Sequence, residues 1–319
     1  MAGMEAAGAS GAGLSITLSD GATMPTIGYG LYLIPPDEAE ACVLAAVAAG
    51  YRHFDGAAFY DNEAAVGRGL ARAVSELGVP RAELFVTTKV WTTDRTFEDA
   101  LASVERSHAE LGGAAPLSLA LVHWPVPGGA HVEMYRALQE CVRRGLVERI
   151  GLSNYTPEDY DELMASGVVT VAPVVNQIEA SPFLHRKETI AYFRAKGVAV
   201  QAFKPLQRGA ALADPTVGAV AARVGASPAA VLVRWGVQKG LSVLVKSSKP
   251  ERLAANLRDA DAGWALSDGD VAALDALTTD DALATAHAHY LKRRAGTAAP
   301  WGDGPRPRLA EAQGASCPA

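Results

Sequence analysis

The chain has 319 residues, 49% of them hydrophobic, and a formal net charge of −6. This length fits either two domains or one large α/β domain with a sizeable core. The modest acidity, without an evident basic face, argues against nucleic acid as a partner. The three cysteines, Cys42, Cys141 and Cys317, are widely spaced. That spacing suits a reducing compartment and indicates neither a disulfide framework nor a metal knuckle.

Both ends of the chain are predicted to lie outside the folded domain. Residues 1–13 lack the basic and apolar regions of a secretory signal and are interpreted as a flexible tail. Residues 295–319 are rich in Pro, Gly and Ala, which is typical of a loop or a disordered tail. No apolar run is long enough to span a membrane. We therefore expect one domain over residues 14–294, no membrane partner and a cytoplasmic location.

The first predicted element is a β-hairpin over 14–25, with Asp20-Gly21 at its turn. After it, short apolar segments alternate with longer helical ones. Strands are predicted at 26–30, 51–55, 84–90, 117–124, 148–153, 173–179, 198–203 and 241–246. Helices are predicted at 36–49, 63–77, 96–111, 131–144, 156–166, 187–196, 216–239 (broken near Ser227-Pro228) and about 249–257.

Eight strand–helix pairs in succession, with strands nearly continuous in Val, Ile and Leu, indicate a parallel sheet covered by helices. A closed (β/α)8 TIM barrel, preceded in the chain by the N-terminal hairpin, is the simplest architecture at this length. A doubly wound sheet is the alternative, and it usually carries GxGxxG after its first strand. Here GYGLYL (28–33) lacks the third glycine and GASGAG (8–13) has no strand before it. Neither is a credible nucleotide fingerprint.

Polar residues at the C-terminal ends of the strands are the candidates for chemistry, because barrels keep their active sites there. In chain order they are Asp55 with Tyr60, Lys89 with Trp91, His123 with Trp124, Ser153 with Asn154, Gln177 with Glu179, Lys204, and Lys246 with Ser247 and Ser248.

Four of these residues form a coherent acid catalyst. A free phenol has a pKa of about 10, and an ammonium beside it lowers that pKa by stabilising the phenolate. Lys89 can provide the ammonium and Asp55 its carboxylate partner. His123 can orient a carbonyl oxygen while Tyr60 supplies the proton, help typically worth about 10² to 10⁴ in rate. Singly, each residue is more often structural; together, at the ends of three successive strands, they favour catalysis.

The segment KSSKPER (246–252) follows the last predicted strand and opens a helix. Ser248 is a suitable N-cap, and Glu251 three residues later completes a capping box. With Lys246, Lys249 and Arg252 nearby, the helix start is a candidate anion site. A capped helix with solvated cations is the alternative interpretation.

The chain resembles the aldo-keto reductase family from about Ile16 to Leu277. The motifs are GYRHFDGAAFYDNEAAVGRGL (50–70), TTKVW (87–91), LVHWP (121–125), RGLVERIGLSNY (144–155), NQIEASPF (176–183), FKPLQRG (203–209) and VKSSKPERLAAN (245–256). Each is weak alone, but their order and spacing are highly specific. The resemblance implies a catalytic tetrad of Asp55, Tyr60, Lys89 and His123.

The resemblance also implies NADPH as the cofactor, with NADH as the alternative. In the family the last motif holds the adenosine 2′-phosphate, others hold the nicotinamide carboxamide, and an aromatic ring stacks on the nicotinamide. The implied contacts are Gly30, Leu31, Asp55, Ser153, Asn154, Gln177, Phe203, Lys204, Pro205, Leu206, Lys246, Ser247, Ser248, Arg252 and Asn256. Four positions depart from the family habit: Leu31, Gly56, Lys204 and Ala255.

Implied substrate contacts are Tyr32, Tyr60, Trp91, His123 and Trp124. Large aromatic walls favour apolar or aromatic carbonyl compounds. No metal site is expected, because His287 and His289 have too few partners and are interpreted as loop surface. By the resemblance, the segment from His287 to Trp301 forms a C-terminal loop over the active site.

These observations predict an NADPH-dependent reductase of small aldehydes or ketones, acting as a monomer or weak dimer. Two alternatives remain open. One is a cofactor-binding regulatory or scaffold subunit with weak turnover. The other is NAD-linked oxidation of an alcohol or sugar alcohol.

Overall fold

The computed structural model describes residues 14–247, 249–261 and 263–294. Eight parallel strands close into a barrel in the order β10-β3-β4-β5-β6-β7-β8-β9, which confirms the predicted (β/α)8 fold. The strands are β3 (Ile27–Gly30), β4 (His53–Asp55), β5 (Phe85–Val90), β6 (Leu119–Val122), β7 (Ile150–Ser153), β8 (Val175–Glu179), β9 (Ala199–Phe203) and β10 (Ser242–Val245). Each lies inside the range predicted for it.

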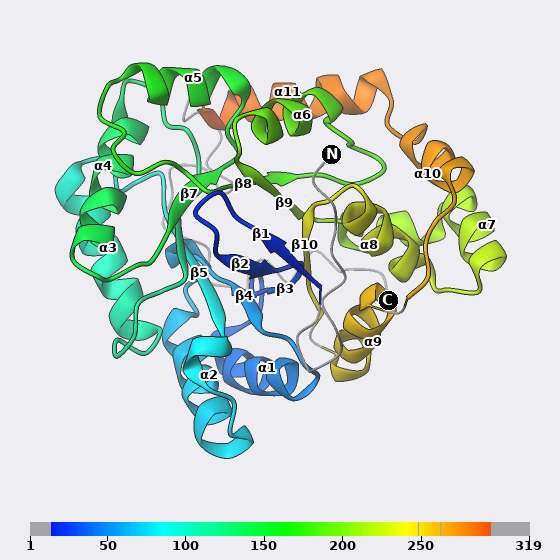
Figure 1. The fold of residues 1–319 in the computed structure, drawn as a ribbon, viewed down its shortest axis with the longest axis horizontal. Helices are drawn as coiled ribbons and strands as arrows, with labels where there is room; N and C mark the ends of the chain where they lie inside the picture. Colours follow the sequence, from blue (N-terminus) through cyan, green and yellow to red (C-terminus); the bar gives the residue numbers. More distant parts are fainter. Residues whose placement is uncertain (1–13, 248, 262, 295–319) are drawn as a thin grey trace.

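Helices form a ring around the barrel (Figure 1). They are α1 (Pro36–Ala48), α2 (Glu63–Leu77), α3 (Phe97–Glu110), α4 (Ala130–Arg143), α5 (Pro157–Ala165), α6 (Lys187–Ala195), α7 (Pro215–Val224), α8 (Pro228–Gln238), α9 (Pro250–Asp261), α10 (Asp268–Asp275) and α11 (Asp280–Arg294). Short 3-10 helices lie at Ala58–Tyr60, Arg81–Glu83 and Gln207–Ala213. The break predicted in 216–239 separates α7 from α8, because Ser227 caps α8 by accepting a hydrogen bond from the Ala230 N–H.

The last two helices differ from expectation. His287 and His289 are exposed, as expected, but they lie on the helix α11, so the predicted loop is wrong. Thr279 opens this helix by accepting a hydrogen bond from the Ala282 N–H. Its alanine-rich sequence favours helix but lacks a clear apolar stripe, which is the signal that sequence patterns depend on. The rest of the predicted C-terminal loop, residues 295–301, lies outside the described residues, as do the predicted tails 1–13 and 295–319.

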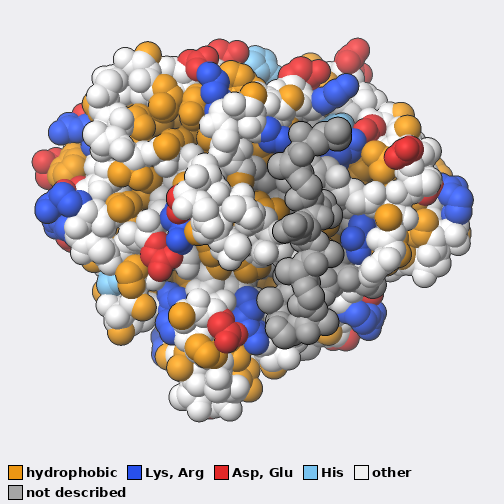
Figure 2. All heavy atoms as spheres, in the orientation of Figure 1, with side chains coloured by type: hydrophobic (Ala, Val, Ile, Leu, Met, Phe, Trp, Pro, Cys, Tyr) orange, Lys and Arg blue, Asp and Glu red, His pale blue; other side chains and the backbone are white. Residues whose placement is uncertain are grey.

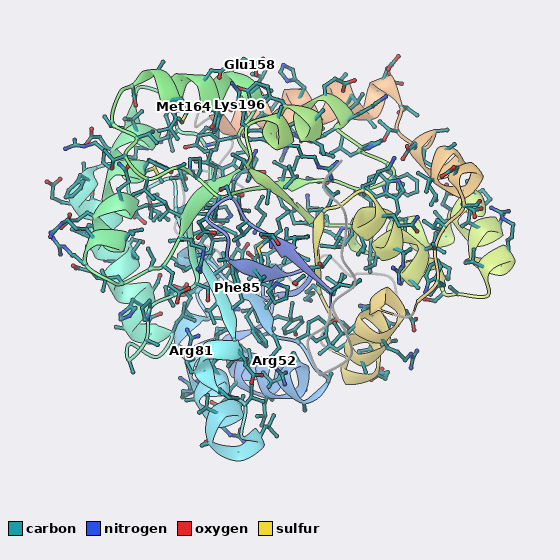
Figure 3. The ribbon with its side chains drawn as sticks, viewed as in Figure 1. Arg52, Arg81, Phe85, Glu158, Met164 and Lys196 are labelled. Atoms are coloured by element: carbon teal, nitrogen blue, oxygen red, sulfur yellow. The ribbon has the colours of Figure 1, made fainter. Side chains whose placement is uncertain are left out.

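The predicted N-terminal hairpin is present as β1 (Ser15–Thr17) paired antiparallel with β2 (Thr23–Pro25). It lies across the N-terminal ends of the barrel strands, in front of them in Figure 1. Leu18 and Met24 of the hairpin pack with apolar residues at the starts of the strands, among them Phe85, which lies behind the hairpin in Figure 3. This end of the barrel is therefore closed by apolar packing.

The larger core lies between the strands and the helices. On the face that carries the hairpin, basic and acidic side chains are interspersed with apolar ones (Figure 2). Among the described residues, no single helix is long and apolar enough to cross a membrane. The pair α7 and α8 meets that requirement only when taken together, and it is bent by 87°.

Candidate active site

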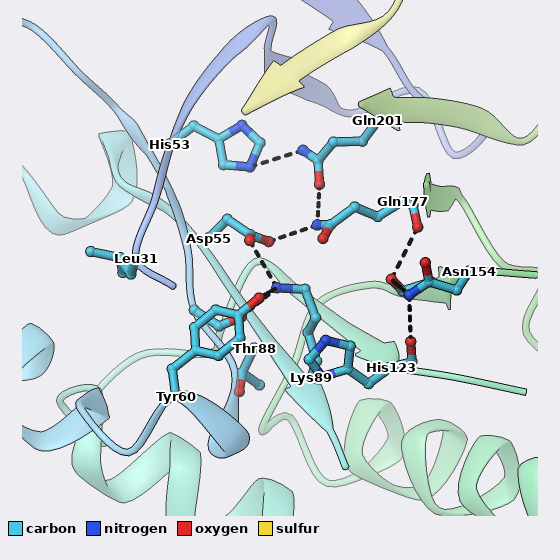
Figure 4. A network of polar contacts seen from close by, with 12 residues as sticks. Leu31, His53, Asp55, Tyr60, Thr88, Lys89, His123, Asn154, Gln177 and Gln201 are labelled. Atoms are coloured by element: carbon cyan, nitrogen blue, oxygen red, sulfur yellow. Dashed lines mark hydrogen bonds and ion pairs between the residues drawn. The ribbon is translucent and has the colours of Figure 1, made fainter. Parts of the chain in front are cut away.

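Lys89 is the centre of a buried polar cluster at the C-terminal ends of β4 and β5 (Figure 4). Its ammonium nitrogen lies 2.8 Å from Asp55 Oδ2, 2.7 Å from the Gly56 carbonyl oxygen and 3.0 Å from the Tyr60 hydroxyl. An ammonium has three hydrogens, so these three acceptors satisfy it completely. The lysine and the carboxylate are 1% and 3% exposed, which makes the ion pair a buried one. The structure thus brings together three of the four predicted catalytic residues.

The contact with Lys89 fixes the direction of the Tyr60 hydroxyl. An ammonium can only donate, so the phenolic oxygen accepts from it. The hydrogen of Tyr60 must therefore point to another acceptor. The aromatic ring of His123 lies beside the phenol, with ring centroids 5.9 Å apart. All four predicted catalytic residues consequently meet at one place.

Burial controls the protonation of this cluster more than the sequence suggested. Desolvation raises the pKa of Tyr60 well above its usual range, and the nearby Asp55 carboxylate adds to the rise. Burial therefore outweighs the lowering of this pKa expected from the Lys89 ammonium. Desolvation also lowers the pKa of Lys89, against the opposing pull of Asp55. Tyr60 is thus held as a neutral phenol that retains its proton.

Aromatic side chains surround the phenol. Tyr32 lies 5.0 Å from the Tyr60 ring between centroids, and Trp91 lies 4.8 Å from the His123 ring. Phe59 stacks on Trp91 at 3.9 Å, a contact that the sequence analysis missed. Trp124 follows His123 at the end of β6 and is half-buried. The predicted aromatic wall is present around the phenol, although its contact with a substrate stays a prediction.

Two amide side chains offer acceptors at the mouth of the barrel. Asn154 donates its amide N–H groups to the His123 carbonyl oxygen at 3.0 Å and to Ser153 Oγ at 3.1 Å. Gln177 donates to Asp55 Oδ1 at 2.7 Å. Their amide oxygens remain for an outside donor, and the N–H₂ group of a carboxamide is such a donor. Asn154 and Gln177 therefore fit the nicotinamide carboxamide, the group that the family resemblance assigns to them.

The other predicted cofactor contacts are spread along the C-terminal rim. Gly30 ends β3, where an added Cβ would lie 3.6 Å from the Val245 carbonyl oxygen, an ordinary contact distance. Leu31 is 1% exposed, and its backbone N–H donates to the Asp55 carbonyl oxygen at 3.0 Å. Phe203 ends β9 with a half-buried ring, followed by buried Pro205 and half-buried Leu206. The described structure places all of them near the strand ends.

Two departures from the family habit have clear neighbours. Lys204 adopts a left-handed backbone, with φ of 54°, and its ammonium lies 2.7 Å from Glu179 Oε2. At Gly56 an added Cβ would lie 3.3 Å from the Thr87 carbonyl oxygen, which is tight. The Gly56 carbonyl also accepts from Lys89. A larger residue at Gly56 would therefore press on the backbone beside the ion pair.

The predicted phosphate segment follows β10. Lys246 and Arg252 are exposed, and the Ser247 hydroxyl accepts from the Lys249 N–H at 3.0 Å. The Ser247 carbonyl oxygen accepts from the buried Tyr29 hydroxyl at 2.8 Å, which ties this loop to the core.

Ser248, the predicted N-cap, lies outside the described residues, and its capping role stays a prediction. Asn256 is 8% exposed, so little of its surface is available to an adenine ring, and Ala255 beside it is half-buried. Exposed cations at a helix start nevertheless suit a phosphate group.

Several polar residues that support the cluster were missed from sequence. Glu63 is 4% exposed and accepts from Thr88 Oγ1 at 2.5 Å and from Ser107 Oγ at 2.6 Å. Burial raises the pKa of its carboxyl group. Asn62 holds the loop that carries Tyr32 by donating to the Leu31 and Ile34 carbonyl oxygens. Both belong to the stretch YDNE, where a polar pair opening a helix would normally be solvated.

Two further residues, His53 and Gln201, were also missed, and both are completely buried. The available signal was their position. His53 lies two residues before Asp55 on the same strand, so both side chains point to the same face. Gln201 is a single polar residue within an apolar strand. In the described part of the chain, no group of three or more His, Cys, Asp or Glu side chains is placed to hold a metal ion.

Comparison with known proteins agrees with this geometry. The profile of the Aldo/keto reductase family matches residues 21–279. The chain belongs to the aldo-keto reductase family. It is 39% identical over 270 residues to an aldo-keto reductase of Mycolicibacterium smegmatis, covering 84% of this chain and 94% of that protein.

Solved structures of other family members have the same fold. An aldo/keto reductase from Brucella melitensis is 35% identical, with a TM-score of 0.76 over 83% of this chain and 97% of that one. A Bombyx mori aldo-keto reductase in complex with NADP is 30% identical, with a TM-score of 0.76 over 83% and 93% of the two chains. Membership of this family makes the protein an oxidoreductase of carbonyl compounds that uses a nicotinamide cofactor.

Proposed function

We propose that this aldo-keto reductase reduces small aldehydes or ketones to alcohols with NADPH, and that Tyr60 donates the proton. The observation that carries the proposal is the partly buried contact of 3.0 Å between the Lys89 ammonium and the Tyr60 hydroxyl. It leaves the phenolic hydrogen directed away from the lysine, toward any acceptor at the mouth of the barrel. A carbonyl oxygen is such an acceptor.

The protein's own residues then move one proton. His123 orients the carbonyl oxygen beside the phenol, and the aromatic wall excludes water. When bound, the nicotinamide supplies the hydride for the carbonyl carbon. As negative charge develops on the oxygen, Tyr60 transfers its proton there, and Lys89 stabilises the phenolate that is left. Asp55 keeps the ammonium in place and charged throughout.

The decisive experiment is Tyr60→Phe, which removes only the hydroxyl. Reduction of an aromatic aldehyde such as nitrobenzaldehyde should fall by about 10² to 10⁴. Binding of NADPH, followed by quenching of protein fluorescence, should persist. Tyr192→Phe, at a half-buried phenol on α6 that donates to Asp161, is the matched control and should keep full activity. Full reduction by Tyr60→Phe would disprove the proton-donor role.

Preference for NADPH rests on Lys246 and Arg252 at the start of α9. Arg252→Ala should weaken NADPH binding by about tenfold, which corresponds to the loss of one charge-assisted hydrogen bond. NADH binding should not change, because NADH has no 2′-phosphate. Arg258→Ala, on the same helix, is the control. Equal binding of both cofactors before and after Arg252→Ala would refute the phosphate assignment.

A panel of aldoses, aromatic aldehydes, quinones and keto acids separates the proposed activity from its alternatives. Rapid NADPH oxidation with any class supports the reductase. A scaffold or regulatory subunit would bind NADPH and turn over none of them. An alcohol dehydrogenase role would appear as NAD reduction by a sugar alcohol that exceeds every reductive rate.

A further inference from the structure

A chain of buried polar groups runs through the barrel from the hairpin to the candidate active site (Figure 4). The Pro25 carbonyl oxygen lies 3.0 Å from His53 Nδ1, and His53 Nε2 lies 3.3 Å from Gln201 Nε2. Gln201 Oε1 lies 2.6 Å from Gln177 Nε2, which also contacts Asp55 Oδ1 at 2.7 Å. Its four side chains are at most 3% exposed. The chain therefore links a backbone carbonyl at one end of the barrel to the lysine-binding carboxylate at the other.

The direction of the first hydrogen bond is fixed by the backbone. The Pro25 carbonyl can only accept, so His53 Nδ1 carries its hydrogen. Burial lowers the pKa of His53, although the Pro25 contact and the Asp55 charge oppose this, so the ring is neutral. Its Nε2 is then an acceptor, and the Gln201 amide N–H₂ group is the donor.

The next bonds follow from the first. The Gln201 N–H₂ group also faces Ser242 Oγ at 3.1 Å, so its Oε1 is left to face Gln177. Gln177 must then direct both amide hydrogens inward, one to Gln201 Oε1 and one to Asp55 Oδ1. If the Gln177 amide were reversed, its oxygen would face both Gln201 Oε1 and the carboxylate, which are acceptors. One orientation of Gln177 is therefore strongly favoured.

The barrel leaves space for this chain. An added Cβ at Gly28 would lie 2.6 Å from Leu244 Cδ2 and 3.0 Å from Cγ of His53, so glycine leaves room for both side chains. Gln177, Gln201 and Ser242 occupy paired positions on β8, β9 and β10, so their side chains project to the same side of the barrel wall. Burying several amides in place of packed hydrocarbon costs free energy unless each is hydrogen-bonded. Apart from the Gln177 oxygen, which faces the mouth of the barrel, the amide groups of the chain are hydrogen-bonded, which suits a role in orientation.

We propose that Gln201, itself set by His53, is a positioning residue that fixes the orientation of the Gln177 amide. In that orientation Gln177 presents only its oxygen to the cofactor and gives Asp55 a hydrogen bond, leaving Asp55 Oδ2 for Lys89. The role in cofactor binding rests on the proposed function, in which the nicotinamide lies at this mouth. The orientation itself depends only on contacts within the protein.

The test compares Gln201→Met with Gln201→Glu. Methionine keeps the length of the side chain but cannot accept from Gln177 as an amide oxygen does. Gln201→Met should weaken NADPH binding and lower kcat, each by about tenfold, the effect of one lost hydrogen bond in a buried network. Glutamate protonated at the oxygen that faces His53, as burial favours, donates there and keeps its other oxygen toward Gln177, so Gln201→Glu should stay within about threefold of the wild type in both quantities.

Gln139→Met is the matched control. Gln139 lies on α4 and holds the 168–171 loop through hydrogen bonds to Val168, Thr170 and Val171. This variant should lose thermal stability while kcat and NADPH binding remain unchanged. A purely structural role for Gln201 predicts the same behaviour in Gln201→Met, and that result would overturn the proposal.

A second measurement does not require turnover. The side-chain amide resonances of Gln177, assigned with a Gln177→Glu variant, report its two hydrogen bonds by nuclear magnetic resonance. They should move in Gln201→Met and remain close to the wild type in Gln201→Glu. If the wild type reduces no carbonyl, the proposed function fails, yet these resonances still test the orientation. Unchanged resonances in Gln201→Met would refute it, whatever the activity.

Discussion

The two ends of the barrel are built from the same eight strands but serve opposite purposes. At the N-terminal end, Leu18 and Met24 of the hairpin close the barrel with apolar packing. At the C-terminal end, Asp55 and Lys89 form an ion pair just as deeply buried. Burial alone therefore does not distinguish residues that serve stability from residues that serve chemistry. The two ends differ in whether the buried groups are apolar or charged. Removing an apolar group leaves a cavity, whereas removing one member of the ion pair leaves a buried charge without its partner.

The largest expected effect is at the charged end. Lys89→Met leaves the Asp55 carboxylate buried without its ammonium and should cost about 3–5 kcal/mol of unfolding free energy. Adding Asp55→Asn removes the stranded charge and should recover most of that stability, measured by urea unfolding. Carbonyl reduction should be lost in both variants. If the double variant is no more stable than the single one, the ion pair does not control stability here.

At the apolar end a deletion should cost stability alone. Leu119 is completely buried beneath the hairpin. Leu119→Ala should lower the unfolding free energy by about 2–5 kcal/mol, because it removes packed methyl groups and leaves a cavity. Leu77→Ala, at a side chain 41% exposed on α2, is the control and should change it little. A fall in kcat in Leu119→Ala at temperatures where it is folded would contradict the separation of the two ends.

His53, which lies between the two ends, should make the unfolding free energy of the protein depend on pH. Because burial lowers its pKa, the unfolded chain binds a proton below about pH 6.5 while the folded protein does not. The unfolding free energy should therefore fall as pH decreases below that value, by at most about 1.4 kcal/mol per pH unit. His53→Phe should lack this contribution. If the unfolding free energies of the wild type and His53→Phe change in parallel between pH 7.5 and 5, His53 makes no such contribution.

The smallest effect is expected at the rim. Lys204 and Glu179 form a partly exposed ion pair, with side chains 32% and 22% exposed, so Lys204→Ser should change stability by less than about 1 kcal/mol. If Lys204 contacts the cofactor pyrophosphate, NADPH binding should weaken by at most about fivefold, and more at low salt. Lys196→Ser, at an exposed lysine labelled in Figure 3, is the control. If NADPH binding to both the wild type and Lys204→Ser is independent of salt concentration, Lys204 does not contact the pyrophosphate.

The barrel and the meeting of Asp55, Tyr60, Lys89 and His123 at its mouth could be predicted because they rest on strong signals. Eight apolar segments of strand length identify the barrel, and the rule that chemistry lies at strand ends selects Asp55, Lys89 and His123. Tyr60 follows on the loop after β4. The cofactor roles of Ser153, Asn154 and the phosphate segment stay predictions, because the contacts within the protein do not test them.

What the sequence could not provide is the balance between competing effects. The pKa of Tyr60 depends on weighing the Lys89 charge against desolvation, which requires distances and burial. Gln201 appears in the sequence as one polar residue in an apolar strand. Its importance emerges only when β8 and β10 place Gln177 and Ser242 beside it. Similarly, α11 lacks an apolar stripe and was missed.

The hydrogen bond from Tyr29 to the Ser247 carbonyl has a consequence for the energetics of cofactor binding. The Tyr29 ring is completely buried, so its hydrogen bond ties Ser247 to the core before any ligand arrives. If this segment binds NADPH as proposed, binding incurs little conformational entropy cost at Ser247. Calorimetric titration with NADPH should show a heat-capacity change set by the surface that the cofactor covers, without the added contribution of a folding loop.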